Sequence, residues 1–455
     1  MKIHLVSLGC ARNQVDSESM TGSLLAAGHT ITPEAGQAEV IVVNTCSFIE
    51  SAADESIDTI LALAQLKETG ACRRIVVAGC LPERYQEEIA ASLPEVDQFL
   101  GTGAFHQIVT AVEAAGPVEK CLLPDPDAIV LSQTYDQRFL SQPHMAYLKI
   151  AEGCDRHCTY CIIPRLRGHQ KSRPMEQIVH EARDLIDTGV KELVLVAQES
   201  TAYGSDLGLR HGLADLLTSL ADISPETWLR VLYGHPESID QETIQVMGSL
   251  SNICAYFDIP VQHASDPVLK RMGRHYMGED LYRLFHDIRE KVPDASLRTT
   301  LIAGFPGETE ADFKTLVSFV EDIRFDHLGV FTYSDSDDLP SHGLDGHVSA
   351  EKALERYDTI MSQQLAISEA SNQRHIDAVL PVLIEEASEE KLYVGRTAFQ
   401  APEVDGITFV HGENLQPGCF ANVQITDAYA YDLVGSIVNF HAGGSAMKIY
   451  GTIRE

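Results

Sequence analysis

The chain has 455 residues, which is too long for one ordinary domain and indicates about three. Hydrophobic residues make up 44% of it and charged residues 22%. This composition is typical of a globular protein and supplies enough apolar surface for sizeable cores. Its 66 acidic and 34 basic side chains leave a formal charge of −32, a field that repels phosphate backbones and attracts basic partners, although an acidic or salt-adapted proteome gives the same imbalance.

Cysteine usage indicates a reducing compartment. Ten cysteines are few for a disulfide scaffold of this length, and they are clustered or lie at the ends of predicted strands, which favours metal ligation. The N-terminal apolar run is too short for a signal peptide, and no stretch is long and apolar enough to span a bilayer. We therefore expect a soluble, cytoplasmic protein with no membrane partner.

Residues 1–116 alternate between strand and helix patterns. Short β-rich runs occupy residues 3–8, 40–43 and 75–78, and a helical stripe lies between the last two, formed by Ala53, Ile57, Ile60, Leu61 and Ala64. This pattern predicts a parallel α/β domain. Residues 117–144, with Pro124 and Pro126 and little periodicity, are interpreted as a linker.

Cys10, Cys46 and Cys80 each follow one of these three strands, two of them directly after a glycine. The carboxyl ends of parallel strands share one edge of the sheet, where ligands bind, so the three thiols are expected to converge. The alternative is three small buried residues at strand ends, which is common for cysteine. The repeated placement favours a second three-thiolate cluster site. The other cysteines outside the loop at 153–164 are interpreted as structural.

Residues 145–371 repeat the strand-helix alternation. Strands are predicted at 147–151, 193–197, 229–233, 256–259, 296–302 and 326–333, with helices that include one after Pro174 and another at 353–368. Six such units predict a partial (β/α) barrel whose site lies at the carboxyl ends of the strands.

A loop with three cysteines follows the first of these strands. Cys154, Cys158 and Cys161 have the Cys-x3-Cys-x2-Cys spacing of a [4Fe-4S] site, with Tyr160 before the last cysteine. Three protein ligands leave one of four irons open for a small molecule. The alternative is a zinc knuckle or unrelated thiols, but no fourth cysteine follows closely and only His157 and His169 lie near.

Residues 372–440 change to short alternating strands at 379–384, 392–396, 407–411, 420–426 and 432–438, which predicts a five-stranded OB-like barrel; residues 441–455 form a tail. Between residues 376 and 440 the bases are Lys391 and Arg396, against ten acids: Asp377, Glu385, Glu386, Glu389, Glu390, Glu403, Asp405, Glu413, Asp427 and Asp432. This barrel has the wrong charge for RNA and the right charge for a basic protein.

The two cysteine sets together resemble those of the methylthiotransferases, a branch of the radical S-adenosylmethionine (SAM) enzymes. The resemblance covers the whole chain and implies an α/β fold: an N-terminal methylthiotransferase domain, a central radical SAM domain of partial (β/α)-barrel type and a C-terminal TRAM barrel. It implies two [4Fe-4S] clusters, one on Cys154, Cys158 and Cys161 with SAM on its open iron, and an auxiliary one on Cys10, Cys46 and Cys80.

Four segments are most similar to the branch of this family that modifies a ribosomal protein: Val-Ser-Leu-Gly-Cys-Ala-Arg-Asn-Gln-Val-Asp-Ser-Glu at 6–18, Ala-Gln-Glu-Ser-Thr-Ala-Tyr-Gly at 197–204, Asp-Ile-Pro-Val-Gln-His at 258–263 and Tyr-Asp-Leu-Val-Gly at 431–435. Two departures are a loop at 333–340 without a proline after Ser334, and a Gly-rich tail after residue 441. Neither touches a predicted cluster ligand.

The resemblance implies a transferase of sulfur-containing groups that adds a methylthio group to the β-carbon of an aspartate in small-subunit ribosomal protein S twelve (uS12), free or on the ribosome. An electron donor is a further expected partner. The alternatives are a MiaB-type tRNA adenosine methylthiotransferase, for which the acidic charge makes tRNA an unfavourable partner, and a non-catalytic iron-sulfur protein that docks on the ribosome. The sequence identifies no catalytic side chain.

The remaining site predictions concern SAM. Gln198 and Glu199 end the second barrel strand where relatives hold the SAM amino group, although a polar strand-end pair is an equal alternative. The turn at 304–307, Gly-Phe-Pro-Gly, is a weaker candidate for a SAM contact. Four basic residues after the cluster loop are candidates to neutralise the cluster or the SAM carboxylate, with a solvated basic loop as the alternative: Arg165, Arg167, Lys171 and Arg173.

Overall fold

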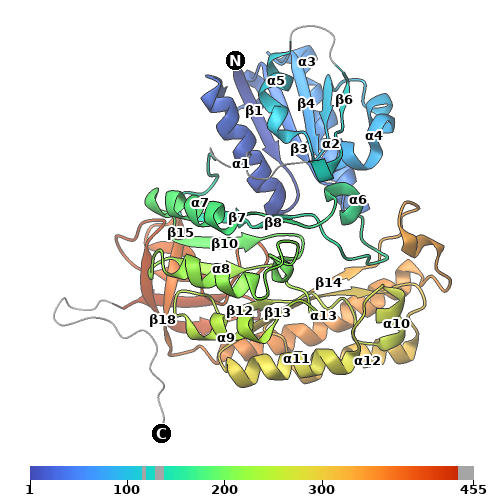
Figure 1. Cartoon of the computed structure of the whole chain (residues 1–455). Helices are drawn as coiled ribbons and strands as arrows, with labels where there is room; N and C mark the ends of the chain where they lie inside the picture. Colours follow the sequence, from blue (N-terminus) through green and yellow to red (C-terminus); the bar gives the residue numbers. More distant parts are fainter. Residues whose placement is uncertain (115–118, 129–137, 439–455) are drawn as a thin grey trace.

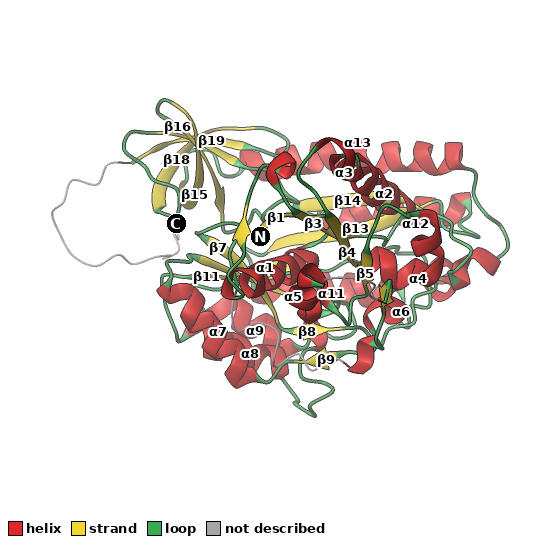
Figure 2. Ribbon diagram, turned by 90° about the horizontal axis from the view of Figure 1, so that it is seen from above, coloured by secondary structure: helices red, strands yellow, loops and turns green. Residues whose placement is uncertain are grey.

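A computed structural model of the chain describes residues 1–114, 119–128 and 138–438, so the predicted tail lies outside the described residues. Figures 1 and 2 show three parts: an N-terminal sheet with its helices stacked on the central domain, and a C-terminal barrel at one end of that central domain. In the described ranges, no helix combines the length and the apolar character needed to cross a membrane.

The N-terminal sheet is parallel and has the order β2-β1-β3-β4-β5-β6. Its strands are β1 (Lys2–Ser7), β2 (Thr30–Ile31), β3 (Val40–Thr45), β4 (Arg74–Gly79), β5 (Gln98–Leu100) and β6 (Cys121–Leu122), and its helices are α1 (Ala11–Ala26), α2 (Glu50–Ala64), α3 (Leu66–Thr69), α4 (Cys80–Ser92) and α5 (Ile108–Glu113). The three long strands match the predicted ones. The short strand β6 lies in the stretch interpreted as a linker and extends the sheet.

The central domain contains six parallel strands in two three-stranded halves, β7-β10-β11 and β12-β13-β14, which a parallel bridge between Leu229 and Ile253 brings together. The strands are β7 (Met145–Lys149), β10 (Glu192–Val196), β11 (Trp228–Val231), β12 (Tyr256–Asp258), β13 (Ser296–Ala303) and β14 (His327–Thr332). The predicted partial barrel is confirmed: all six strands are present, and their buried aliphatic side chains form one core with the surrounding helices.

Helices connect these strands as a (β/α) barrel requires. They are α6 (Ile163–Arg167), α7 (Met175–Asp187), α8 (Gly212–Ala221), α9 (Gln241–Ser249), α10 (Asp266–Arg271), α11 (Gly278–Lys291), α12 (Glu310–Ile323) and α13 (Ala350–Gln373). A small antiparallel pair, β8 (Ala151–Glu152) and β9 (Lys171–Ser172), closes the base of the cysteine loop. The cysteine loop therefore leaves and re-enters the domain at one fixed point.

The C-terminal barrel is closed in the order β15-β16-β17-β19-β18. Its strands are β15 (Val379–Glu389), β16 (Leu392–Thr397), β17 (Thr408–His411), β18 (Phe420–Ala428) and β19 (Leu433–Ile437), and all five overlap the predicted ones. Its own small core contains Val382, Val410, Val423 and Leu433.

A buried ion cluster joins this barrel to the central domain. The carboxylate of Glu192 accepts hydrogen bonds from Arg230 Nε at 2.7 Å and from Arg396 Nη2 at 2.5 Å, and all three side chains are almost fully buried. Arg396 also donates to Glu385 at 2.7 Å. Two of the charges counted in the acidic barrel, Glu385 and Arg396, are therefore part of its attachment and not of its free surface.

We predict that Glu192→Gln destabilises the protein by about 3–5 kcal/mol, because it leaves the buried guanidinium of Arg230 without its carboxylate partner and Arg396 with Glu385 alone. The measurement is the urea midpoint of unfolding. The matched control is Glu413→Gln, which removes an exposed pair with Lys391 and should change stability by about 0–1 kcal/mol. Equal effects of the two substitutions would contradict the prediction.

The same carboxylate makes stability depend on pH. Burial raises the pKa of Glu192, but Arg396 and Arg230 outweigh burial and lower the pKa to about 2. A lowered pKa in the folded state means that the stabilisation is complete above the unfolded pKa of about 4.3 and is lost as the pH falls towards 2. In Glu192→Gln this part of the pH dependence should be absent.

Candidate active site

The loop that carries Cys154, Cys158 and Cys161 is fixed by backbone contacts. Gly153 has a φ of +79°, and a Cβ there would lie 2.0 Å from the carbonyl oxygen of His169, so only glycine fits this approach. Cys154 N donates to Gly168 O at 3.1 Å, and Thr159 N donates to Met272 O at 3.0 Å. The loop is thus held at both ends while its thiols remain free for ligation.

Tyr160, the aromatic residue before the last cysteine, anchors the loop to the far half of the barrel. Its hydroxyl accepts a hydrogen bond from Arg274 at 2.6 Å, and its ring packs edge-on against Phe305 at a centroid distance of 6.2 Å. Phe305 belongs to the turn at 304–307. In this structure the turn contacts Tyr160 and α13, where a Cβ on Gly304 would lie 2.4 Å from the Cβ of Ala353.

The N-terminal cysteines lie where the sequence places them, at the carboxyl ends of β1, β3 and β4. A Cβ on Gly9 would lie 2.6 Å from the Cβ of Cys46 and 3.1 Å from its Sγ, and a Cβ on Gly79 would lie 2.5 Å from Asn44 Oδ1. Both glycines have positive φ, +93° and +99°. Glycine precedes Cys10 and Cys80 because the three strand-end loops pack too closely for any side chain there.

The three thiols of each cysteine set suit an iron-sulfur cluster better than a single metal ion. In the described parts of the chain, no three Cys, His, Asp or Glu side chains are placed to hold one metal ion. A single zinc ion needs its ligands within about 2.0–2.3 Å of one point. A cubane has four irons, and each can take its own thiolate, so three separated thiols suit it.

Burial keeps most of these thiols protonated until a metal binds. Burial raises the pKa of Cys161 to about 12 and the pKa values of Cys154 and Cys46 to about 11, with neighbouring thiols of the same set adding to it. For Cys10, burial also raises the pKa, but Arg12 and Arg167 outweigh it, so the pKa is lowered on balance. Thiols of the same set raise one another's pKa values because they lie close together.

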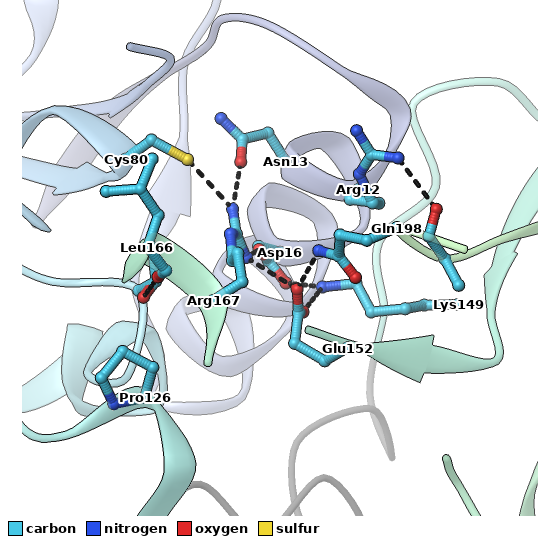
Figure 3. A network of polar contacts seen from close by, with 12 residues as sticks. Arg12, Asn13, Asp16, Cys80, Pro126, Lys149, Glu152, Leu166, Arg167 and Gln198 are labelled. Atoms are coloured by element: carbon cyan, nitrogen blue, oxygen red, sulfur yellow. Dashed lines mark hydrogen bonds and ion pairs between the residues drawn. The ribbon is translucent and has the colours of Figure 1, made fainter. Parts of the chain in front are cut away.

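The N-terminal cysteines face the carboxyl edge of the central barrel. Arg12, two residues after Cys10, donates to the carbonyl of Ala197 at the end of β10 at 2.9 Å, and its guanidinium lies 4.3 Å from the ring centre of Tyr233. Arg167, at the end of α6, lies 3.5 Å from Cys80 Sγ (Figure 3). Two parts of the chain that are distant in sequence thus bring their cysteine sets to one interface.

The side chains of the two residues expected at SAM have different partners within the central domain. Glu199 is buried, its Oε2 lies 3.9 Å from Cys154 Sγ, and Arg156 donates to it at 2.9 and 3.0 Å. Gln198 instead donates to Glu152, in the network below Cys80 shown in Figure 3. The amide oxygen of Gln198 is buried and has no hydrogen-bond partner among the described residues.

The four basic residues after the cluster loop do not form a solvated basic loop. Arg173 is buried and pairs with Glu181 at 2.6 Å, and Arg167 is buried beside Cys80. Arg165 and Lys171 are more exposed and contact Asp338 and Asp127, at 3.5 and 3.4 Å. The contacts of Arg165, Arg167 and Lys171 described above thus run to Asp338, Cys80 and Asp127, and not to the cysteines at 154–161.

A cleft of about 660 Å³ lies between the N-terminal and central domains. Its walls are the segment after Cys46, the cluster loop at Tyr160, the ends of β13 and β14, and the loop at 333–339. Phe48 and Phe331 line it and are 42% and 56% exposed. The cleft is open, has apolar walls, and carries the carboxylates of Glu50 and Asp54.

Arg84 holds one wall of this cleft in place. Its Nε and Nη2 donate to the two carboxylate oxygens of Asp338 at 2.9 and 2.7 Å, and its Nη1 donates to Ser47 O at 2.5 Å. It therefore ties the loop at 333–339 to the segment after Cys46. Arg84 could not be predicted from the sequence, because its partner Asp338 is 254 residues away and no local pattern indicates the pair.

Comparison with known proteins identifies the three parts. The uncharacterized protein family UPF0004 matches residues 2–101, the Radical SAM superfamily matches residues 148–320, and the TRAM domain matches residues 377–438. These are the three parts seen in the structure, in the same order.

Relatives extend over nearly the full chain. Proteins named ribosomal protein uS12 methylthiotransferase RimO from Desulfosudis oleivorans and Clostridioides difficile are 55% and 47% identical to it, over 96% of this chain and 99% of each relative. The chain belongs to this methylthiotransferase family. The predicted family, the radical SAM assignment and the class of sulfur-group transferase are thereby confirmed.

Solved structures agree on the fold. A radical SAM methyltransferase, TsrM from Kitasatospora setae, solved with cobalamin and a [4Fe-4S] cluster, matches with a TM-score of 0.55 over 75% of this chain and 77% of its own. Its structure with tryptophan and a SAM analogue matches with a TM-score of 0.53 over 72% of each chain. At 15% identity these likenesses concern the architecture alone.

We predict that Arg84→Ala frees the loop at 333–339, because it removes both hydrogen bonds to Asp338. Amide hydrogen exchange in that loop should become faster, while exchange in the strands of the central barrel stays unchanged. The matched control is Arg165→Ala, which loses a longer, exposed contact to the same carboxylate. If loop exchange is the same in Arg84→Ala and in the control, Arg84 does not hold this wall.

Proposed function

We propose that the chain adds a methylthio group to the β-carbon of an aspartate in ribosomal protein uS12. The single observation that supports it most is that Arg167, which follows one three-cysteine set, contacts Cys80 of the other, so that both sets lie at one domain interface. The names of the full-length relatives support uS12 as the substrate. We propose a cytoplasmic location, since ribosomal proteins are the expected substrate class.

We propose two [4Fe-4S] clusters. Cys154, Cys158 and Cys161 would hold the one that binds SAM, and Cys10, Cys46 and Cys80 would hold the auxiliary one. When bound and reduced by an external electron donor, the first supplies the one-electron cleavage of SAM that leads to C–H abstraction, and the second supplies the sulfur that is transferred. Glu199, buried beside Cys154, and Gln198, with its unpartnered amide oxygen, remain our candidates for contacts to SAM.

The side chains of the chain itself position groups and exclude water. Tyr160 and Phe305 give the cluster loop an apolar, rigid backing. Arg84 holds the cleft wall, and Phe48 and Phe331 offer apolar surface against which a substrate loop can pack. A substrate carbon held between the two cysteine sets is close to both, which raises its effective concentration towards each step.

The test is an anaerobic reaction with reconstituted protein, SAM, dithionite, uS12 and tRNA. We expect the mass gain of one methylthio group on a single aspartate of uS12 and none on tRNA, measured by mass spectrometry. A modified tRNA beside unmodified uS12 would contradict the proposal and favour the MiaB-type alternative. Absence of SAM cleavage would favour a non-catalytic protein.

Cysteine variants separate the two sets. The reconstituted protein should hold about eight irons, four for each cubane, and a triple Cys→Ala change of either set should leave half. Loss of the set at 154–161 should abolish SAM cleavage. Loss of Cys10, Cys46 and Cys80 should leave 5′-deoxyadenosine formation and abolish methylthio transfer. A variant of this second kind that still modifies uS12 would exclude the auxiliary cluster as the sulfur carrier.

The hairpin between β15 and β16 supplies an acidic surface for a basic substrate. Glu386, Glu389 and Glu390 are exposed, whereas Glu385 accepts hydrogen bonds from Arg396. We predict that reversing the three exposed acids to Lys weakens uS12 binding, and that the binding of the unchanged protein weakens with salt. The measurement is affinity at two salt concentrations.

The matched control reverses three exposed acids of the central domain, Glu226, Glu242 and Glu290, and so changes the net charge equally. SAM cleavage should be unchanged in both variants. Equal loss of binding in both would mean that overall charge, and not the hairpin, attracts the substrate.

A further inference from the structure

Arg167 belongs to one cysteine loop and contacts a cysteine of the other set. It is the last residue of α6, six positions after Cys161, and its side chain is 4% exposed. Its Nη2 lies 3.5 Å from Cys80 Sγ, in hydrogen-bond range for sulfur. Figure 3 shows the guanidinium between Cys80 on one side and the carboxylates of the central network on the other.

The direction of this guanidinium is fixed by its other partners. Nη1 donates to Asp16 at 2.9 Å and to Glu152 at 3.4 Å, and Nη2 also donates to Asn13 Oδ1 at 2.5 Å. Lys149 neutralises the same two carboxylates at 2.5 and 2.7 Å. Because a guanidinium is planar and its N–H groups form a rigid fork, these contacts aim one N–H at Cys80.

The surroundings of Cys80 are dry, which strengthens such a contact. Ile162 and Leu166 of the cluster loop and helix α6 pack with Cys80 and Leu339 in one buried apolar group. Thr102 of the N-terminal domain donates to the carbonyl of Leu166 at 2.6 Å. Helix α6 therefore lies directly against Cys80.

We propose that Arg167 is a positioning residue for the auxiliary cluster, which raises the reduction potential of that cluster through its N–H contact to the Cys80 sulfur. The reduced cluster carries one more negative charge, so a donor and a positive group beside a ligating sulfur stabilise it more than the oxidised cluster. This inference rests on the proposed auxiliary cluster. It assigns Arg167 to the set at Cys10, Cys46 and Cys80, although the residue follows the other set in sequence.

The test is a redox titration of the anaerobically reconstituted protein, followed by electron paramagnetic resonance, for Arg167→Lys and Arg167→Gln. The signal that persists in the Cys154, Cys158, Cys161 triple variant identifies the auxiliary cluster. In Arg167→Lys its reduction equilibrium should fall about tenfold, which is about 59 mV for a one-electron couple, and Arg167→Gln, which also loses the charge, should fall further. The midpoint of the other cluster should not move.

The matched control is Arg138→Lys. Arg138 is equally buried and also bridges two carboxylates, Glu18 at 2.5 Å and Glu181 at 2.7 Å, and in the described residues it makes no hydrogen bond to a cysteine. The substitution Arg138→Lys should lower thermal stability but leave the reduction midpoints of both clusters unchanged. An unmoved auxiliary midpoint in Arg167→Lys at full iron content, or an equal shift of both clusters, overturns the inference.

A second measurement uses the unchanged protein and does not depend on the folding of a variant. Protein labelled with ¹⁵N-arginine should show a ¹⁵N hyperfine coupling on the auxiliary signal, and the absence of that coupling overturns the inference. Iron content separates this outcome from failure of the proposed function. Four irons in the wild-type protein would overturn the second cluster and the inference together, whereas eight irons with an unmoved midpoint would overturn the role of Arg167 alone.

Discussion

Two cations and two carboxylates, Lys149, Arg167, Asp16 and Glu152, lie buried where α1 of the N-terminal domain meets the first strands of the central barrel. Their charges balance, and every carboxylate has two cationic partners. A buried network of this kind adds little net stability, but the loss of one member leaves a buried charge unpaired at a cost of about 3–5 kcal/mol. The docking of the two domains that pairs all four groups also places Cys80 beside α6.

The placement of the cysteines follows from this docking and from local backbone geometry. Gly9 and Gly79 let the strand-end loops of β1, β3 and β4 approach closely, so three thiols that are far apart in sequence become neighbours. Gly153 has the same effect at the base of the other loop. The domain interface then brings the two sets together, and a cleft at that interface is lined by Phe48 from one domain and Phe331 from the other.

The features of this structure that could be predicted are those that leave a local pattern in the sequence. Six barrel strands and the five C-terminal strands were expected from alternation and turn residues, and the cysteines from their spacing and strand-end positions. The strands β2, β5 and β6 have two or three residues each, too few for a period to be visible. Side-chain pairs that are distant in sequence could not be predicted from local pattern: Arg84 pairs with Asp338 of another domain, and Gln198, expected at SAM, donates to Glu152 of its own domain.

The charges too could be counted from the sequence, but their positions in the fold could not be predicted from it. Counting residues gives a formal charge of −32 and a strongly acidic C-terminal barrel, but Glu385 and Arg396 of that count are neutralised inside the domain interface. The acids that remain exposed are Glu386, Glu389 and Glu390 at the tip of the β15–β16 hairpin, and Asp377, Glu403, Glu413 and Asp427 elsewhere on the barrel. Several arginines instead lie near the cysteines: Arg167 and Arg274 are buried, beside Cys80 and Tyr160, whereas Arg12, near Cys10, and Arg156, on Glu199 next to Cys154, are half-buried.

The separation of exposed acids from arginines near the cysteines has a physical consequence. Thiolate sites are anionic, and in a chain so rich in acids they would lie in an unfavourable field without local cations. The buried arginines compensate that field at short range, where screening by salt is weak, and leave the long-range field of the surface negative. A basic protein is therefore attracted from a distance by the whole molecule. The cysteine sites themselves experience mainly the guanidinium groups that the domain interface fixes beside them.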